Sequence, residues 1–439
     1  MISSSNIRSS LAALALAAAL SSGVHADDAK MTFSGAGWTQ FGMIVKSLDT
    51  TENKVLNGRG MLGTGAQFAV EYRGSEKIEV NAGLGMGSGH NLAVRKENGF
   101  YAPFGTGAYV AAANVKYSFW NEDAKNLFFK IGLFPYDYAP DAQNLGLYLL
   151  RGPVYPGFLM SGFETKEVLP VANMLGFQFH HQTGFFEQDL LFSFDSDWFP
   201  YWDISPAYIA KVHAGSALTI GAGVNLYHWI PVDKKLTSEK INEVAYIDTA
   251  TNDTTYISFK GTKLMGNFSF DPKALFGYSG DGLLGAEDLK LYGEVAVIGL
   301  DKDKAHNALY GTISKRMPMM VGFNLPAFKI LDRLNVEVEY YQAPWVDDPS
   351  IYNHTSGPQV TPIPKISALD TNNTKDNLKW SIYGSRVIAN HVKLSVQAAS
   401  DHSRPGLFQG YGDNNPPINH VPYFSPSEWY WSTKIAYFF

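Results

Sequence analysis

The last twelve residues of the chain, Glu428–Phe439, alternate between two kinds of side chain. Counting back from the end in steps of two gives Phe439, Tyr437, Ile435, Thr433, Trp431 and Trp429. The interleaved set is Phe438, Ala436, Lys434, Ser432 and Tyr430. A period of two predicts a β-strand with two different faces. The first face carries aromatic rings at both ends, which suits a strand that crosses lipid, because such rings favour the two membrane interfaces. The alternative is the edge strand of a soluble β-sandwich.

The end of this strand also resembles a known signature. A terminal Phe with Tyr two residues before it resembles the carboxyl-terminal signature of Gram-negative outer-membrane β-barrels. In that family the barrel assembly machinery reads the last strand. The resemblance therefore implies that the assembly machinery and outer-membrane lipids are partners, and that the assembly signal includes Trp431, Tyr437 and Phe439.

Residues 1–26 have the pattern of a cleaved secretory signal peptide. Arg8 supplies a positive charge, Leu11–Leu20 is an apolar run, and Val24–Ala26 is a small-x-small cleavage site. The apolar run is too short to span a bilayer, which takes roughly 20 residues. We therefore expect export by the general secretory route, followed by integration of residues 27–439 into the outer membrane as one barrel.

Composition excludes several other classes of protein. The chain has no cysteine, which excludes a disulfide framework and thiolate-bound zinc. Its net charge of −6 does not suit nucleic-acid binding. It is 14% aromatic, yet after residue 26 it has no apolar run of about 18 residues, as a membrane helix would need. These features indicate a membrane protein that crosses with strands.

Two-faced segments recur along the whole chain. In one of them, Val336 and Val338 alternate with Asn335 and Glu337. We count sixteen such segments, and the connectors between them alternate between short turns and long loops. The segment at 309–323 is the weakest because it contains Pro318, which cannot donate to a strand ladder. The predicted fold is an all-β, transmembrane antiparallel barrel of about 16 strands, with about 14 or 18 as the alternatives.

The longest connector in the first half of the chain, residues 135–173, follows the fifth predicted strand. In general porins the loop at this position, the third outer loop, folds into the lumen and forms the constriction. The similarity implies a pore constriction lined by Tyr136, Asp137, Tyr138, Asp141, Arg151, Glu164, Lys166 and Glu167. A loop folded over the barrel mouth or packed on a neighbouring subunit is the alternative. The stretch 144–157 within it also resembles a family of functionally uncharacterised barrel proteins, which implies no activity.

Charged residues on the predicted inner faces nearly cancel in sign. They include Lys130, Lys290, Glu294, Glu337, Glu339, Lys379 and Lys393. We expect these lumen-wall side chains to be solvated and screened by salt, so that the four acids and two bases of the loop at 135–173 dominate. That balance predicts a mild preference for cations.

The predicted function is that of an outer-membrane porin, a passive diffusion channel for small hydrophilic solutes or ions without a cofactor. A structural or adhesive barrel with an occluded lumen, acting through the outer loops 344–376 and 402–427, is the alternative. An enzyme is disfavoured because no catalytic constellation is visible. No metal site is predicted either, since His180 and His181 are adjacent on a strand and point to opposite faces. Whether the barrel forms a homotrimer is left open.

Overall fold

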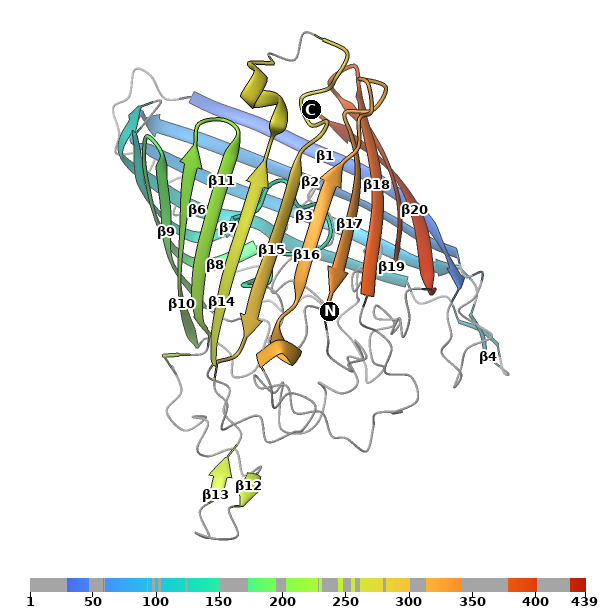
Figure 1. Cartoon of the computed structure of the whole chain (residues 1–439). Coiled ribbons are helices and arrows are strands. Elements are labelled where there is room, and N and C mark those ends of the chain that lie inside the picture. The colour runs from blue at the N-terminus through green and yellow to red at the C-terminus, as the bar shows by residue number, and fades with distance from the viewer. Residues whose placement is uncertain are drawn as a thin grey trace.

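Sixteen strands form one closed antiparallel barrel within the described part of the chain (Figure 1). The computed structural model describes residues 30–46, 58, 60–92, 94–96, 99–101, 104–122, 125–150, 173–194, 203–227, 229–230, 244–247, 254–256, 261–278, 282–300, 313–341, 378–400 and 427–439. The barrel strands are β1 (Lys30–Lys46), β2 (Gly60–Ser75), β3 (Ile78–Leu92), β6 (Phe104–Glu122), β7 (Lys125–Pro135), β8 (Asn173–Thr183), β9 (Phe186–Phe194), β10 (Ile204–Ala214), β11 (Leu218–Tyr227), β14 (Gly261–Phe270), β15 (Leu291–Ile298), β16 (Met319–Asn324), β17 (Arg333–Tyr340), β18 (Leu378–Ile388), β19 (Val392–Ser400) and β20 (Trp429–Phe438).

In the described ranges, six shorter elements lie outside the barrel wall. Two small two-stranded sheets pair β4 (Val94–Lys96) with β5 (Gly99–Tyr101) and β12 (Val244–Ile247) with β13 (Thr254–Tyr256). The 3₁₀ helices are η3 (Pro272–Phe276) and η4 (Ile313–Arg316). Within the described residues, no helix is long and apolar enough to cross a membrane.

The first and last strands close the barrel. β1 pairs with β20 from Ala36 opposite Phe438 to Lys46 opposite Trp429. Beyond the last strand residue, Gly35 and Phe439 exchange two backbone hydrogen bonds of 3.0 and 3.1 Å. Closure leaves no unpaired strand edge in the ring, which is what a barrel in lipid requires.

Side chains alternate between the two faces of the wall as the sequence predicts. On β20, Ile435 and Tyr437 are about half exposed on the outer face, whereas Tyr430 and Lys434 are buried on the inner face. The same parity puts large apolar side chains on the outside of many other strands, including Phe33, Phe68, Leu84, Phe179, Ile220, Val321, Ile382 and Val396. The wall is therefore apolar outside and polar inside.

The two ends of the barrel differ. The turn rim, defined by the short connectors 76–77, 184–185, 215–217 and 389–391, includes the β10–β11 hairpin at the top of Figure 1. The opposite loop rim carries the long connectors, together with β4 and the β12–β13 sheet at the bottom of Figure 1. This alternation confirms the prediction, although the connector 271–290 on the turn rim is longer than the other turns there.

One predicted segment is shorter than its pattern indicates. Among the described residues of the stretch 309–323, the one strand is β16, which begins directly after Pro318, and residues 313–316 form η4 instead. A proline has no N–H to give to a neighbouring strand, so the ladder starts beyond it. The count of sixteen strands is unaffected, and the architecture is a closed antiparallel β-barrel.

Candidate functional site

The chain leaves β7 and runs along the inside of the wall as residues 136–150, here called the inner segment. Most of its side chains are buried, among them Tyr138, Leu147 and Tyr148. They pack in one apolar cluster with inward-facing wall residues, namely Met174, Leu191, Ala207, Ile209, Met265, Tyr292, Ala296 and Met320. Those residues come from β8, β9, β10, β14, β15 and β16, so the inner segment lies within the barrel, behind β15 and β16 in the view of Figure 1.

Glu337 on β17 accepts hydrogen bonds from three consecutive backbone N–H groups of the inner segment. Gln143 donates to Oε1 at 2.6 Å, and Asn144 and Leu145 donate to Oε2 at 2.9 and 2.8 Å. The Tyr292 hydroxyl also donates to Oε1, at 2.8 Å. Glu337 is 0% exposed. A buried carboxylate is costly unless donors surround it, and a run of backbone N–H groups is a natural anion nest. The backbone N–H groups of the inner segment and the carboxylate of Glu337 therefore supply each other's hydrogen-bond partners.

Glu294 on β15 makes a second anchor of the same kind. It accepts hydrogen bonds from the backbone N–H groups of Leu147 and Tyr148 at 2.7 and 2.8 Å, and from the Tyr138 hydroxyl at 2.7 Å. Gly146 and Leu147 have φ values of 85° and 58°, in the left-handed region. A Cβ added to Gly146 would lie 3.1 Å from Glu294 Oε2. The left-handed turn directs two N–H groups at one carboxylate, and glycine lets the backbone approach it closely.

Further contacts extend the anchoring from β11 to β17. The Tyr148 hydroxyl donates to Glu339 Oε2 at 3.0 Å, and Asn225 Nδ2 on β11 donates to the carbonyl of Leu149 at 2.9 Å. Between them, Tyr138 accepts the N–H of Leu149 at 3.1 Å. The described inner segment is thus fixed across a broad arc of the wall and does not hang freely in the lumen.

The two acids of the inner segment are themselves engaged. Asp137 accepts the N–H of Ala139 at 2.9 Å. Asp141 accepts the hydroxyl of Ser269 and lies 3.5 Å from Lys290 Nζ. Burial alone would lower the pKa of Lys290, but its hydrogen bond to Glu287 and the charge of Asp141 raise this pKa above its usual value. Lys290 therefore keeps its positive charge next to Asp141.

A polar cluster on β8 and β9 holds the start of the inner segment. The Tyr136 hydroxyl donates to Asp189 Oδ2 at 3.0 Å, and Gln178 Nε2 donates to Asp189 Oδ1 at 2.8 Å. His180 Nδ1 lies 2.9 Å from the same Oδ1. Burial and the neighbouring charge of Asp189 raise the pKa of Tyr136 well above its usual value, so the phenol remains a donor.

The sequence-predicted site residues have three different outcomes. Tyr136, Asp137, Tyr138 and Asp141 lie together on the inner segment, whereas Arg151, Glu164, Lys166 and Glu167 lie outside the described residues. The predicted wall residues do face inward, but four of them are not solvated: Glu294, Glu337, Glu339 and Lys379 are 5%, 0%, 0% and 1% exposed. For the three glutamates the reason is the inner segment, whose donors replace water. Lys130 lies over the rings of Phe128 and Phe134, 5.3 and 5.2 Å from their centroids.

Inward-facing charges are sorted by sign around the ring. The arc that the inner segment contacts, β8 to β17, carries the carboxylates Glu187, Asp189, Glu294, Glu337 and Glu339, with Lys211, Lys263 and Arg333 among them. The rest of the ring carries mainly bases, namely Arg73, Lys116, Lys130, Lys379, Lys393 and Lys434, with Glu71 and Glu79 beside them. The wall charges nearly cancel in total, as the sequence indicates, but acidic and basic side chains lie on different sides of the lumen.

The predicted assembly-signal residues lie on the outer face of the closing strands. Tyr437 and Phe439 are about half exposed, with ring centroids 6.2 Å apart, and the Phe439 ring lies 5.9 Å from that of Phe68. Trp431 packs edge-on against Phe41 at 5.4 Å. These aromatic contacts join β20 to β1 and β2, where the barrel closes.

Sequence reasoning missed the anchoring role of the glutamates and the cluster around His180. The cluster had a detectable signal: the tight turn at 184–185 sets a register that places His180 opposite Asp189 and on the inner face. The anchoring had no detectable signal in the sequence, because the contact between Gln143 and Glu337 joins residues 194 positions apart.

Comparisons with known proteins give weak matches. No protein-family model matches the chain, and no curated protein matches it. Among solved structures, a triple mutant of the Rhodopseudomonas blastica porin is 9% identical, with 93% of this chain and 100% of that chain covered and a TM-score of 0.44. A double mutant of the same porin has 8% identity, the same coverage and a TM-score of 0.44. These values are too low to transfer a function, so the inferences below rest on the residues of this chain.

Proposed function

We propose that this protein is an outer-membrane porin, a passive and non-enzymatic diffusion channel for small hydrophilic solutes or ions that needs no cofactor. The observation that carries the proposal is the closed barrel of sixteen strands with an inner segment anchored to one side of its inner wall. Barrels of 16–18 strands are wide enough to leave an aqueous channel. Outer-membrane lipids and the assembly machinery are the partners that this function requires.

In this proposal the inner segment narrows the lumen and sets its selectivity. Asp137 and Asp141 bring two negative charges and no positive ones to residues 136–150. The separated wall charges support a field across the narrowed lumen, which orients polar solutes. A mild cation preference is expected, reduced by the pairing of Asp141 with Lys290.

Conductance in planar bilayers tests the proposal. The purified barrel should give stepwise currents, and liposomes that contain it should admit small sugars. The reversal potential in a salt gradient should show the cation preference, more strongly at low salt because screening is weaker there. A folded barrel that neither conducts nor admits sugars would refute the channel.

A second candidate is a structural or adhesive barrel with an occluded lumen. It is favoured by the burial of inward-facing side chains on strands beyond the inner segment's arc, among them Lys379, Tyr383, Tyr430 and Lys434. In that case the loops 344–376 and 402–427 would carry the function. If this candidate is right, the barrel should not conduct in planar bilayers, although its heat-modifiable migration on gels is normal.

A further inference from the structure

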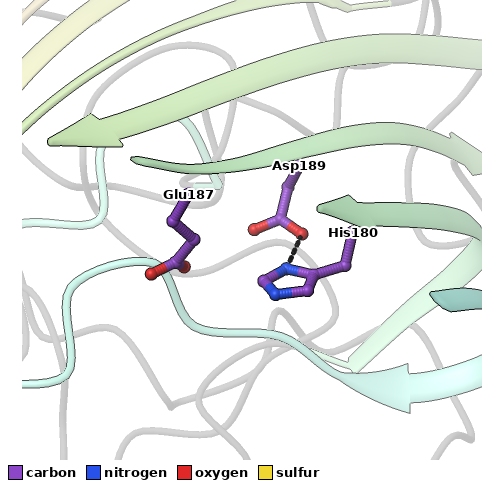
Figure 2. Close-up of side chains that lie close together, drawn as sticks. All are labelled: His180, Glu187 and Asp189. Atoms are coloured by element: carbon purple, nitrogen blue, oxygen red, sulfur yellow. Dashed lines mark hydrogen bonds and ion pairs between the residues drawn. The ribbon is translucent and has the colours of Figure 1, made fainter. Parts of the chain in front are cut away.

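Three side chains with metal-ligating atoms converge on the inner wall near the turn rim. His180 comes from β8, and Glu187 and Asp189 come from β9 (Figure 2). The strand register places His180 opposite Asp189, and Glu187 is two residues from Asp189, so all three face inward. One ligand atom from each lies within 4.8 Å of the others. The pairing register of β8 and β9 therefore brings the three side chains together.

Neighbouring groups hold these side chains in place. Gln178 and Tyr136 donate to the two oxygens of Asp189 at 2.8 and 3.0 Å. The ring of His180 stacks on Phe128, with centroids 4.6 Å apart and an interplanar angle of 19°. Ligands of protein-bound metals are typically oriented by outer contacts of this kind.

Glu187 is held from the next strand, β10. Lys211 Nζ lies 2.9 Å from Oε1, and His213 Nε2 lies 3.1 Å from Oε2. His213 is in turn oriented by Thr219 Oγ1, 3.0 Å from its Nδ1. A metal bound through Oε2 leaves the Lys211 contact intact and brings His213 within reach as an additional ligand.

The alternative is an ion-pair network with no ligand. Against it stands the charge of Asp189: Lys211 pairs with Glu187, but Lys130 acts on Asp189 only from a distance, so within the described residues the direct partners of Asp189 are Tyr136, Gln178 and His180. The side chains of His180, Asp189 and Glu187 are only 11%, 5% and 18% exposed, so water screens this charge poorly. A cavity of about 160 Å³ beside residues 138–142 is lined by Glu187, Lys211 and His213, and so borders the cluster at Glu187.

We propose that His180, Glu187 and Asp189 bind a divalent transition-metal ion of the zinc class, an assignment that departs from the absence of a metal site predicted from the sequence. One imidazole and two carboxylates suit such ions, whereas Mg²⁺ and Ca²⁺ favour oxygen ligands alone. Bonds of about 2.0–2.2 Å place tetrahedral ligands about 3.3 Å apart. The ligand atoms of the cluster lie within 4.8 Å of one another, so binding would require them to approach by at most about 1.5 Å. Because Tyr136 touches Asp189, the bound ion would also stabilise the start of the inner segment.

The test is metal binding to the folded, chelator-treated barrel in detergent, and it does not depend on channel activity. Zn²⁺ is titrated by calorimetry and Co²⁺ by its visible absorption spectrum. We expect one ion per chain, displacement of Co²⁺ by Zn²⁺ and no displacement by Mg²⁺. His180→Gln should weaken binding at least about tenfold. Glu187→Gln provides the same test if the first variant does not fold.

The matched control is His181→Gln. His181 is the adjacent residue on β8, its Nδ1 lies 2.9 Å from Gln188 Nε2, and its side chain points to the outer face. This variant should bind the ion as the wild type does, and heat-modifiable migration on gels confirms folding of every variant. The proposal is overturned if the wild type binds no stoichiometric ion, or if His181→Gln weakens binding as much as His180→Gln does.

Discussion

Replacing Glu337 by glutamine should release the inner segment from the wall. The glutamine amide keeps one acceptor oxygen and has an NH₂ donor in place of the second oxygen. This NH₂ group would face either the N–H of Gln143 or the N–H groups of Asn144 and Leu145, and could not accept a hydrogen bond from them. Hydrogen bonds to a charged group contribute about 1.5–3 kcal/mol each, so docking of the segment should weaken by about 2–4 kcal/mol. Since 1.4 kcal/mol is tenfold, the amides of residues 143–145 should exchange about 30- to 700-fold faster.

Hydrogen exchange followed by mass spectrometry measures this release. The matched control is Glu71→Gln, which removes an inward-facing glutamate on β2 that pairs with Arg73 at 2.5 Å. In the control, exchange at 143–145 should stay at the wild-type rate. Unchanged exchange in a folded Glu337→Gln barrel, or an equal increase in the control, would show that the carboxylate does not hold the segment. Release should also raise the noise of the open channel. Replacing this wall residue is therefore expected to change the position of the segment, whereas the sequence-based expectation that the loop acids outweigh the wall charges in ion selectivity stays a prediction.

Four further outcomes are expected. Deleting Phe439 removes its paired hydrogen bonds with Gly35 and its contact with Phe68, and should lower the membrane yield of heat-modifiable barrel; an unchanged yield would argue against an assembly signal. Asp141→Asn should shift the reversal potential toward anions, more at low salt, whereas no shift would place Asp141 away from the ion path. Gly146→Ala should weaken docking of the inner segment by about 1–2 kcal/mol, seen as faster exchange at residues 147–148, because an L-residue is disfavoured at φ 85°. The pKa of Tyr136 is raised, so the stability that its phenol contributes is complete below the pKa of about 10 in the unfolded chain and is lost as pH rises through the pKa in the folded barrel. The variant Tyr136→Phe should therefore show the same tyrosinate absorbance at about pH 11 as the wild type. A decrease equal to the absorbance of one tyrosinate would contradict the burial of Tyr136.

Much of the barrel follows from local rules that are legible in the sequence. Strand parity placed Glu294, Glu337 and Lys379 on the inner face and Ile435 on the outer face, because a strand presents successive side chains to opposite sides. Tight turns such as the one at 184–185 fixed both the hairpin and its register. The exception, the stretch 309–323, shows a limit of pattern alone: Pro318 removes a donor and the strand starts after it.

The sequence by itself thus determined the strands, their two faces and a barrel as the way to satisfy every backbone group without a sheet edge. Only the tertiary structure decided what lies against the inner face. Parity indicates that Glu337 points inward, but it does not reveal whether water or a chain segment meets it there. That depends on the path of residues 136–150, which bond to β17 nearly 200 positions later in the chain. The carboxylates of the wall became anchors because buried charge requires donors, and the backbone N–H groups of the inner segment provide them.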